Sequence, residues 1–136
     1  MVMPYLNFSG NCEEAFKLYE RAFDGKIGHF VRYGDSPYDP ENPMDEMKKN
    51  QVMHAQMMLS DLGGISGADA GFPYEKGSAV NIHVHFTLEE KAEKAFAVLA
   101  EEGVVIGNLA QNPPPDDAGK SGVVKDKFGF IWVLSV

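Results

Sequence analysis

Histidine and amide side chains alternate with apolar residues over residues 81–86, which read Asn-Ile-His-Val-His-Phe. Successive side chains of a strand point to opposite faces of a sheet. As a strand, this stretch therefore places Asn81, His83 and His85 on one face and directs its apolar residues into a core. Two imidazoles and an amide together are unusual on a solvated sheet face, so we interpret this face as one wall of a pocket.

A second strand, predicted over residues 51–59, carries His54 and Gln56 on one face. Imidazole exchanges protons near neutral pH, so His54 and His83 are candidate catalytic acids or bases. Polar groups that line a wet pocket, or core histidines with satisfied hydrogen bonds, are the alternative and favoured reading of the same side chains. A metal site made of three histidines is disfavoured, because His83 and His85 are two residues apart and no anionic group joins them.

The elements that would position these side chains occur twice along the chain. Tyr5 and His83 are 78 residues apart, and so are Gly25 and Gly103. Each pair occupies the same place in a unit made of a short strand, an amphipathic helix and a closing glycine. An internal repeat of this kind indicates a fold built from two similar modules.

The first module is predicted to contain a strand over residues 3–8, a helix over about 12–24, and strands over 27–33, 51–59 and 65–68. Asn11 and Glu14 resemble a capping box, and Gly25 suits the left-handed position after the helix. The second has a strand over 81–86, a helix over about 88–102, a strand over 104–109 and a hairpin over 122–125 and 130–134. The sequence thus predicts one α+β domain of two βαβββ modules, 1–70 and 78–136, joined by a linker over 71–77. Trp132 is expected to face the helices.

Composition narrows the possible partners and locations. The formal net charge of −8 disfavours nucleic acid and anionic membranes as partners. No apolar run is long enough to span a membrane. The single cysteine, Cys12, cannot form an internal disulfide, so a cytoplasmic location is expected. Although Cys12 falls in the first turn of a predicted helix, the neighbouring glutamates oppose thiolate formation, and we interpret it as structural.

Three blocks of the sequence resemble one known family. They are residues 5–16 (Tyr-Leu-Asn-Phe-Ser-Gly-Asn-Cys-Glu-Glu-Ala-Phe), residues 52–55 (Val-Met-His-Ala) and residues 126–132 (Asp-Lys-Phe-Gly-Phe-Ile-Trp). Together they resemble the PhnB-like branch of the vicinal oxygen chelate superfamily, which includes glyoxalase I, bleomycin-resistance proteins and extradiol dioxygenases. The resemblance implies mixed sheets with both helices on the convex face. The branch often carries a demethylubiquinone methyltransferase label, but this chain shows no glycine-rich methyl-donor fold.

The same resemblance implies a divalent metal in the concave sheet, held at positions that correspond here to Tyr5, Ala68, His83 and Val133. The superfamily has a glutamate where this chain has Val133. Only His83 is a conventional ligand, and zinc requires at least three protein ligands. We therefore expect a degenerate metal site, with no bound metal and no cofactor.

Two functions follow from these expectations. The first is a small-molecule-binding protein without a metal, as in the bleomycin-resistance relatives. The alternative is a lyase, isomerase or transferase that uses a metal or a histidine in the same pocket. The expected ligand-facing residues are Tyr5, Asn7, Arg32, His54, Gln56, Asn81, His83 and His85.

Two further expectations concern this pocket. Arg32 is included because it precedes a loop over residues 34–43 and could anchor an anionic ligand, although an ordinary surface arginine on a strand is the favoured reading. Because open sheets leave edges that need cover, a homodimer is also expected, with a pocket that the partner chain helps to complete.

Overall fold

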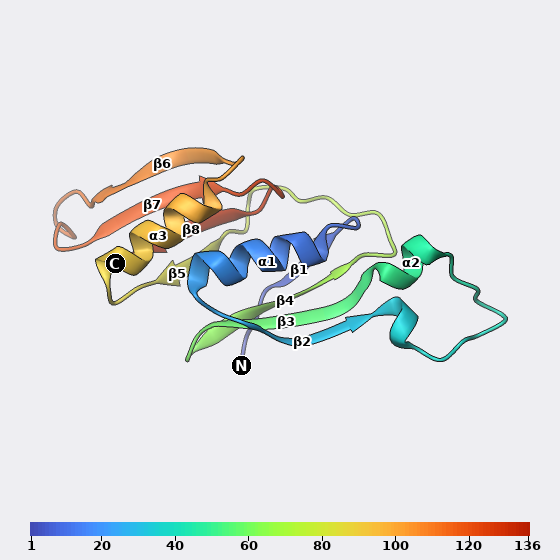
Figure 1. The fold of residues 1–136 in the computed structure, drawn as a ribbon. Coiled ribbons are helices and arrows are strands. Elements are labelled where there is room, and N and C mark those ends of the chain that lie inside the picture. Colours follow the sequence, from blue (N-terminus) through green and yellow to red (C-terminus); the bar gives the residue numbers. More distant parts are fainter. The chain divides into compact units, whose positions relative to one another are not determined.

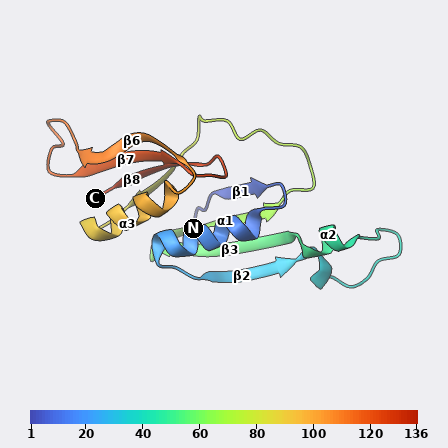
Figure 2. The same cartoon turned by 45° about the horizontal axis from the view of Figure 1, so that its top comes forward.

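The computed structural model describes all 136 residues, which divide into two compact units. The first unit comprises residues 1–20 and 25–74, and the second comprises residues 21–24 and 75–136. Each unit contains a four-stranded sheet (Figures 1 and 2). No helix combines the length and the apolar character needed to cross a membrane.

The first unit is built on a mixed sheet in the order β1-β4-β3-β2. β1 runs parallel to β4, whereas β4 with β3 and β3 with β2 are antiparallel. Its elements are β1 (Tyr5–Phe8), α1 (Cys12–Phe23), β2 (Ile27–Arg32), the 3₁₀ helix η1 (Tyr33–Asp35), α2 (Glu46–Asn50), β3 (Val52–Ser60) and β4 (Gly63–Asp69). The end of α1, from residue 21 onward, belongs to the second unit.

The second unit has the same topology, in the order β5-β8-β7-β6. Its elements are β5 (Ile82–His85), α3 (Glu89–Leu99), β6 (Val104–Gln111), β7 (Lys120–Lys125) and β8 (Ile131–Ser135). β5 is parallel to β8, and the other neighbours are antiparallel. The prediction of an α+β fold with two βαβββ modules and mixed sheets is confirmed.

In each unit a helix packs an aromatic ring onto a glycine of the sheet. A Cβ on Gly67 of β4 would lie 3.0 Å from Phe16 of α1, and a Cβ on Gly122 of β7 would lie 2.8 Å from Phe96 of α3. Such contacts are closer than packed carbon atoms tolerate, so both positions need glycine. Trp132 is fully buried, and its ring lies 5.2 Å from that of Phe23, as expected for a core residue.

The helix ends differ in detail from the prediction. The left-handed residues are Asp24 and Glu102, with φ of 52° and 54°, rather than the glycines that follow them. Gly25 is required for space instead, because a Cβ there would lie 2.7 Å from the Met57 side chain. Gly103 is confined in the same way by the carbonyl oxygen of Lys125. The 78-residue repeat nevertheless holds, since the two left-handed residues are also 78 apart.

A buried aspartate fixes the chain in each unit. Asp69, at the end of β4, accepts hydrogen bonds from the backbone N–H groups of Gly10, Cys12 and Val52, at 2.8, 3.1 and 2.8 Å. This carboxylate, 57 residues away from Cys12, satisfies an N–H group at the start of α1. The local capping box predicted from Asn11 and Glu14 did not indicate that Asp69 accepts this hydrogen bond.

Asp126 is the buried aspartate that accepts hydrogen bonds in the second unit. Its carboxylate accepts hydrogen bonds from the backbone N–H groups of Phe128 and Phe130, at 2.9 and 3.0 Å, and from Trp132 Nε1, at 2.9 Å. The block over residues 126–132, one of the three that carry the family resemblance, therefore closes a loop and anchors the buried indole.

Candidate functional site

The face of the first sheet that points away from α1 carries no residue with a permanent charge. Side-chain alternation and strand register place nine residues other than glycine on it. About a quarter of the chain is charged (24%), so a solvated face of this size would hold about two charged residues. The nine are Tyr5, Asn7, His29, Val31, His54, Gln56, Met58, Ser66 and Ala68. This uncharged face, as we call it below, has the composition of a binding pocket, in which apolar groups surround a few polar ones.

Three rings meet at the centre of the uncharged face. The Tyr5 and His54 ring centroids are 5.8 Å apart, and those of His54 and His29 are 5.2 Å apart. β4 lies between β1 and β3, so Tyr5 and His54 approach each other above its small side chains. Ser66 and Ala68 are consequently only 8% and 6% exposed, whereas Tyr5 remains 53% exposed. The result is a ring platform over a floor of small residues.

The Tyr5 phenol is a hydrogen-bonding group here rather than an anion. Partial burial, with smaller contributions from Tyr33 and Cys12, raises the pKa of Tyr5 above its usual value of about 10. The phenol therefore stays protonated at neutral pH and can donate to a ligand oxygen or nitrogen. Asn7 and Gln56 are half-buried and lie on the same face, so their amides add donors and acceptors beside the rings.

In the second unit, His83 and His85 converge on one hydroxyl group. Ser135 Oγ lies 2.8 Å from His83 Nε2 and 2.9 Å from His85 Nδ1. Both histidines are exposed and share a face, as the alternation predicts. β8 places Ser135 beside His85, and its hydroxyl lies within hydrogen-bonding distance of both rings. The Asn81 side chain is directed to the backbone, donating to the carbonyl oxygen of Ser78 at 3.3 Å.

The residues at the family's metal position do not fit a metal ion. In the second unit His83 pairs with Val133, but in the first unit Tyr5 pairs with Ser66 rather than with the expected Ala68. The register differs because β3 and β4 join through a two-residue turn, whereas five residues separate β7 from β8. Ser66 offers only a hydroxyl oxygen, and no carboxylate side chain stands at this position. No group of three or more His, Cys, Asp or Glu side chains in the chain could hold a metal ion.

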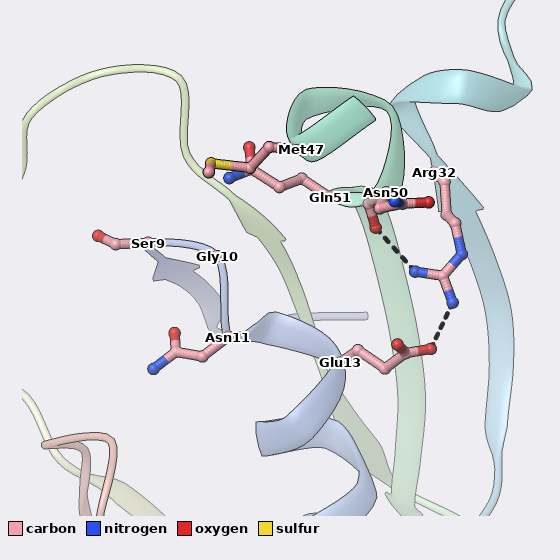
Figure 3. Close-up of a pocket in the computed structure, with 8 residues that line it drawn as sticks. All are labelled: Ser9, Gly10, Asn11, Glu13, Arg32, Met47, Asn50 and Gln51. Atoms are coloured by element: carbon pink, nitrogen blue, oxygen red, sulfur yellow. Dashed lines mark hydrogen bonds and ion pairs between the residues drawn. The ribbon is translucent and has the colours of Figure 1, made fainter. Parts of the chain in front are cut away.

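Arg32 lines a separate groove on the α1 side of the first unit. The groove has a volume of about 830 Å³ and is lined by Ser9, Gly10, Asn11, Glu13, Arg32, Met47, Asn50 and Gln51 (Figure 3). Arg32 Nη2 lies 2.6 Å from Glu13 Oε2, and Nη1 donates to the carbonyl oxygen of Asn50 at 2.8 Å. The guanidinium is therefore already paired with a carboxylate, which offsets its attraction for an anionic ligand.

Two residues of these sites escaped the sequence analysis. His29 was missed because alternation from Ile27 assigns it to the helix side, whereas a bulge at Gly28 turns it to the uncharged face. A glycine inside a strand is a signal for such a bulge. Ser135 was missed because the last strand was expected to end at residue 134, although the strand continues to Ser135 and pairs it with His85.

Comparison with known proteins places this fold in a family. The model of the 3-demethylubiquinone-9 3-methyltransferase family matches residues 1–135. The chain belongs to this family. Protein PA1353 from Pseudomonas aeruginosa is 30% identical, with a TM-score of 0.81, over 98% of this chain and 95% of that one. The PhnB protein from Bacillus cereus is 27% identical, with a TM-score of 0.71, over 98% and 96%.

More distant structures share the architecture alone. The fosfomycin resistance protein FosX from Listeria monocytogenes, solved with Mn(II) and sulfate, is 10% identical, with a TM-score of 0.58 over 100% of this chain and 90% of that one. The family match and the PhnB relative identify a PhnB-like chain, and the likeness to FosX shows that the two proteins share a fold. The manganese of FosX has no counterpart among the side-chain clusters of this chain.

Proposed function

We propose that this protein binds a small, planar, uncharged heteroaromatic molecule on the uncharged face of the first unit. The observation that carries the proposal is the platform formed by the rings of Tyr5, His54 and His29. Aromatic rings contribute large contact area with a defined stacking geometry. A half-exposed platform that rests on buried small residues offers this area to a flat ligand without rearrangement of the sheet.

The absence of permanent charge on this face selects against ionic ligands. Covering an ion with protein costs several kcal/mol unless an opposite charge pairs with it. The nine residues of the uncharged face offer no such partner, but Asn7, Gln56 and the Tyr5 phenol supply hydrogen bonds. A neutral molecule with ring nitrogens and carbonyl groups matches this set. Each satisfied hydrogen bond would contribute roughly 0.5–1.5 kcal/mol to binding.

The proposal requires no metal, since the residues at the family position do not form a metal site. It differs in this respect from a lyase or transferase that polarises its substrate with a divalent ion. The predicted ligand-facing residues of the second unit, Asn81, His83 and His85, and the groove residue Arg32 stay predictions, and the proposed ligand contacts do not depend on them.

A titration series with matched variants tests the proposal. The ligands are neutral bicyclic and tricyclic heteroaromatics, with riboflavin as the reference. Ribitol, the sugar alcohol that forms the side chain of riboflavin, lacks the ring system and serves as the control. We expect riboflavin-like molecules to bind and ribitol not to bind in calorimetry. Loss of one platform ring removes about 1 kcal/mol of stacking, so Tyr5→Ala and His54→Ala should each weaken binding about fivefold.

Tyr38→Ala serves as the control variant, because Tyr38 is 78% exposed and lies outside the sheet. It should leave the affinity unchanged. Two results would overturn the proposal: no member of the series binds at millimolar concentration, or Tyr5→Ala and Tyr38→Ala change the affinity by the same amount.

A further inference from the structure

We infer that His83 and His85 form a two-imidazole binding site for a borderline divalent cation, Cu²⁺ above all, in the second unit. These residues belong to the second unit and the ring platform belongs to the first, so the proposed function does not depend on the cation site. Only His83 coincides with a position that the family resemblance associates with metal. His85 and Ser135 do not, and both histidines come from the single strand β5.

The inference starts from the convergence of two ring nitrogens. His83 Nε2 and His85 Nδ1 both lie within 2.9 Å of Ser135 Oγ. The hydroxyl carries one hydrogen, so it can donate to only one imidazole and must accept an N–H from the other. The hydrogen bonds therefore hold two nitrogen atoms toward one point, and moving the ring proton to the other nitrogen of a ring that donates there would direct both lone pairs to that point.

For a metal ion to bind both nitrogens at this point, the two rings would have to turn toward it. The two nitrogens are separated by no more than the sum of their distances to Ser135 Oγ. A tetrahedral ion with metal–nitrogen bonds of about 2.0–2.1 Å requires nitrogens roughly 3.3 Å apart. Both side chains are exposed, so rotation about their side-chain bonds can close the remaining gap without disturbing the core.

The donor set determines which ion binds and how tightly. Two neutral imidazoles suit first-row ions of intermediate softness, and among these the affinity order places Cu²⁺ above Ni²⁺ and Zn²⁺. No carboxylate joins the pair, and Lys125, the charged residue that alternation places on this face, has the same sign as the ion. The ion is therefore exchangeable and completes its coordination with water, unlike a structural metal that survives purification.

The first unit offers a second histidine pair, which serves as an internal control. His29 and His54 meet through their rings at a centroid distance of 5.2 Å, with planes tilted by 55°. They do not share a hydrogen-bonded atom as His83 and His85 do. The geometry therefore assigns the tighter Cu²⁺ site to the second unit.

The test uses the full chain without an affinity tag and titrates it with Cu²⁺ under calorimetry. The wild-type protein should bind one equivalent more tightly than any other, and its electron paramagnetic resonance spectrum should show two imidazole nitrogens. His83→Gln and His85→Gln should each weaken this binding at least tenfold. Ser135→Ala should retain it within about threefold, because the hydroxyl orients the rings and is not the main ligand.

His54→Gln is the matched control and should leave the Cu²⁺ affinity unchanged. If His83→Gln and His85→Gln bind Cu²⁺ as the wild type does, the inference is wrong. A spectrum with one nitrogen, or a loss of binding in His54→Gln alone, would also overturn it. Circular dichroism of each variant establishes that the fold is intact, so that a lost site is not confused with an unfolded chain.

Discussion

Replacement of Asp69 by asparagine should destabilise the first unit by about 2–3 kcal/mol. The carboxylate accepts three backbone hydrogen bonds while only 2% exposed. An amide keeps one oxygen for the N–H groups of Gly10 and Cys12, but its NH₂ then faces the N–H of Val52. The change removes one hydrogen bond to a charged group, worth about 1.5–3 kcal/mol, and leaves a buried donor without an acceptor.

Urea unfolding followed by far-ultraviolet circular dichroism measures this effect. With a slope near 2 kcal/mol per molar urea, the midpoint of Asp69→Asn should fall by about 1–1.5 M. Fluorescence of Trp132, the single tryptophan, reports on the second unit and provides a separate reading. Asp61→Asn, the same change in an exposed turn, should alter the free energy of unfolding by less than about 0.5 kcal/mol. Equal effects at the two positions would refute the role assigned to the Asp69 hydrogen bonds.

Three further predictions concern packing, reactivity and assembly. Gly67→Ala should destabilise the protein by about 1–3 kcal/mol in urea unfolding, because the new Cβ would lie 2.8 Å from the Leu6 carbonyl oxygen. Gly63→Ala is the control and should have little effect, since the space around Gly63 is open. Cys12 should not react with a thiol reagent until the protein unfolds, since it is fully buried and burial raises the pKa of its thiol; rapid labelling of the native protein would contradict this. Light scattering should give a dimer mass, because both sheets have open edges, and a monomer mass at micromolar concentration would rule out the homodimer.

The sequence was sufficient for the architecture because the repeat and the alternation are local signals. The strand over residues 81–86, for example, was recognised from its period of two, and the structure buries Val84 and exposes His83 and His85 as that period requires. What the sequence could not supply were the contacts between distant segments. The hydrogen bond from Cys12 to Asp69 spans 57 residues, and no local pattern reveals it.

The candidate site was predictable to the same degree. Tyr5 and His54 were each expected among the ligand-facing residues, and their ring centroids lie 5.8 Å apart. His29 joins them only because a bulge reverses the alternation of β2, and bulges depend on strand pairing rather than on strand composition. The metal position was misplaced from Ser66 to Ala68 because turn length, which sets strand register, differs between the two units.

The most direct test of the account locates the ligand on the uncharged face. Nuclear magnetic resonance of protein treated with a chelator would follow the imidazole carbon-bound protons of all four histidines as riboflavin is added, with assignments from His29→Gln and His54→Gln. We expect the signals of His29 and His54 to move with ligand concentration and to move equally well without metal. Ribitol should leave them in place. Signals of both histidines that remain fixed while riboflavin binds, or shifts that require added metal, would contradict it.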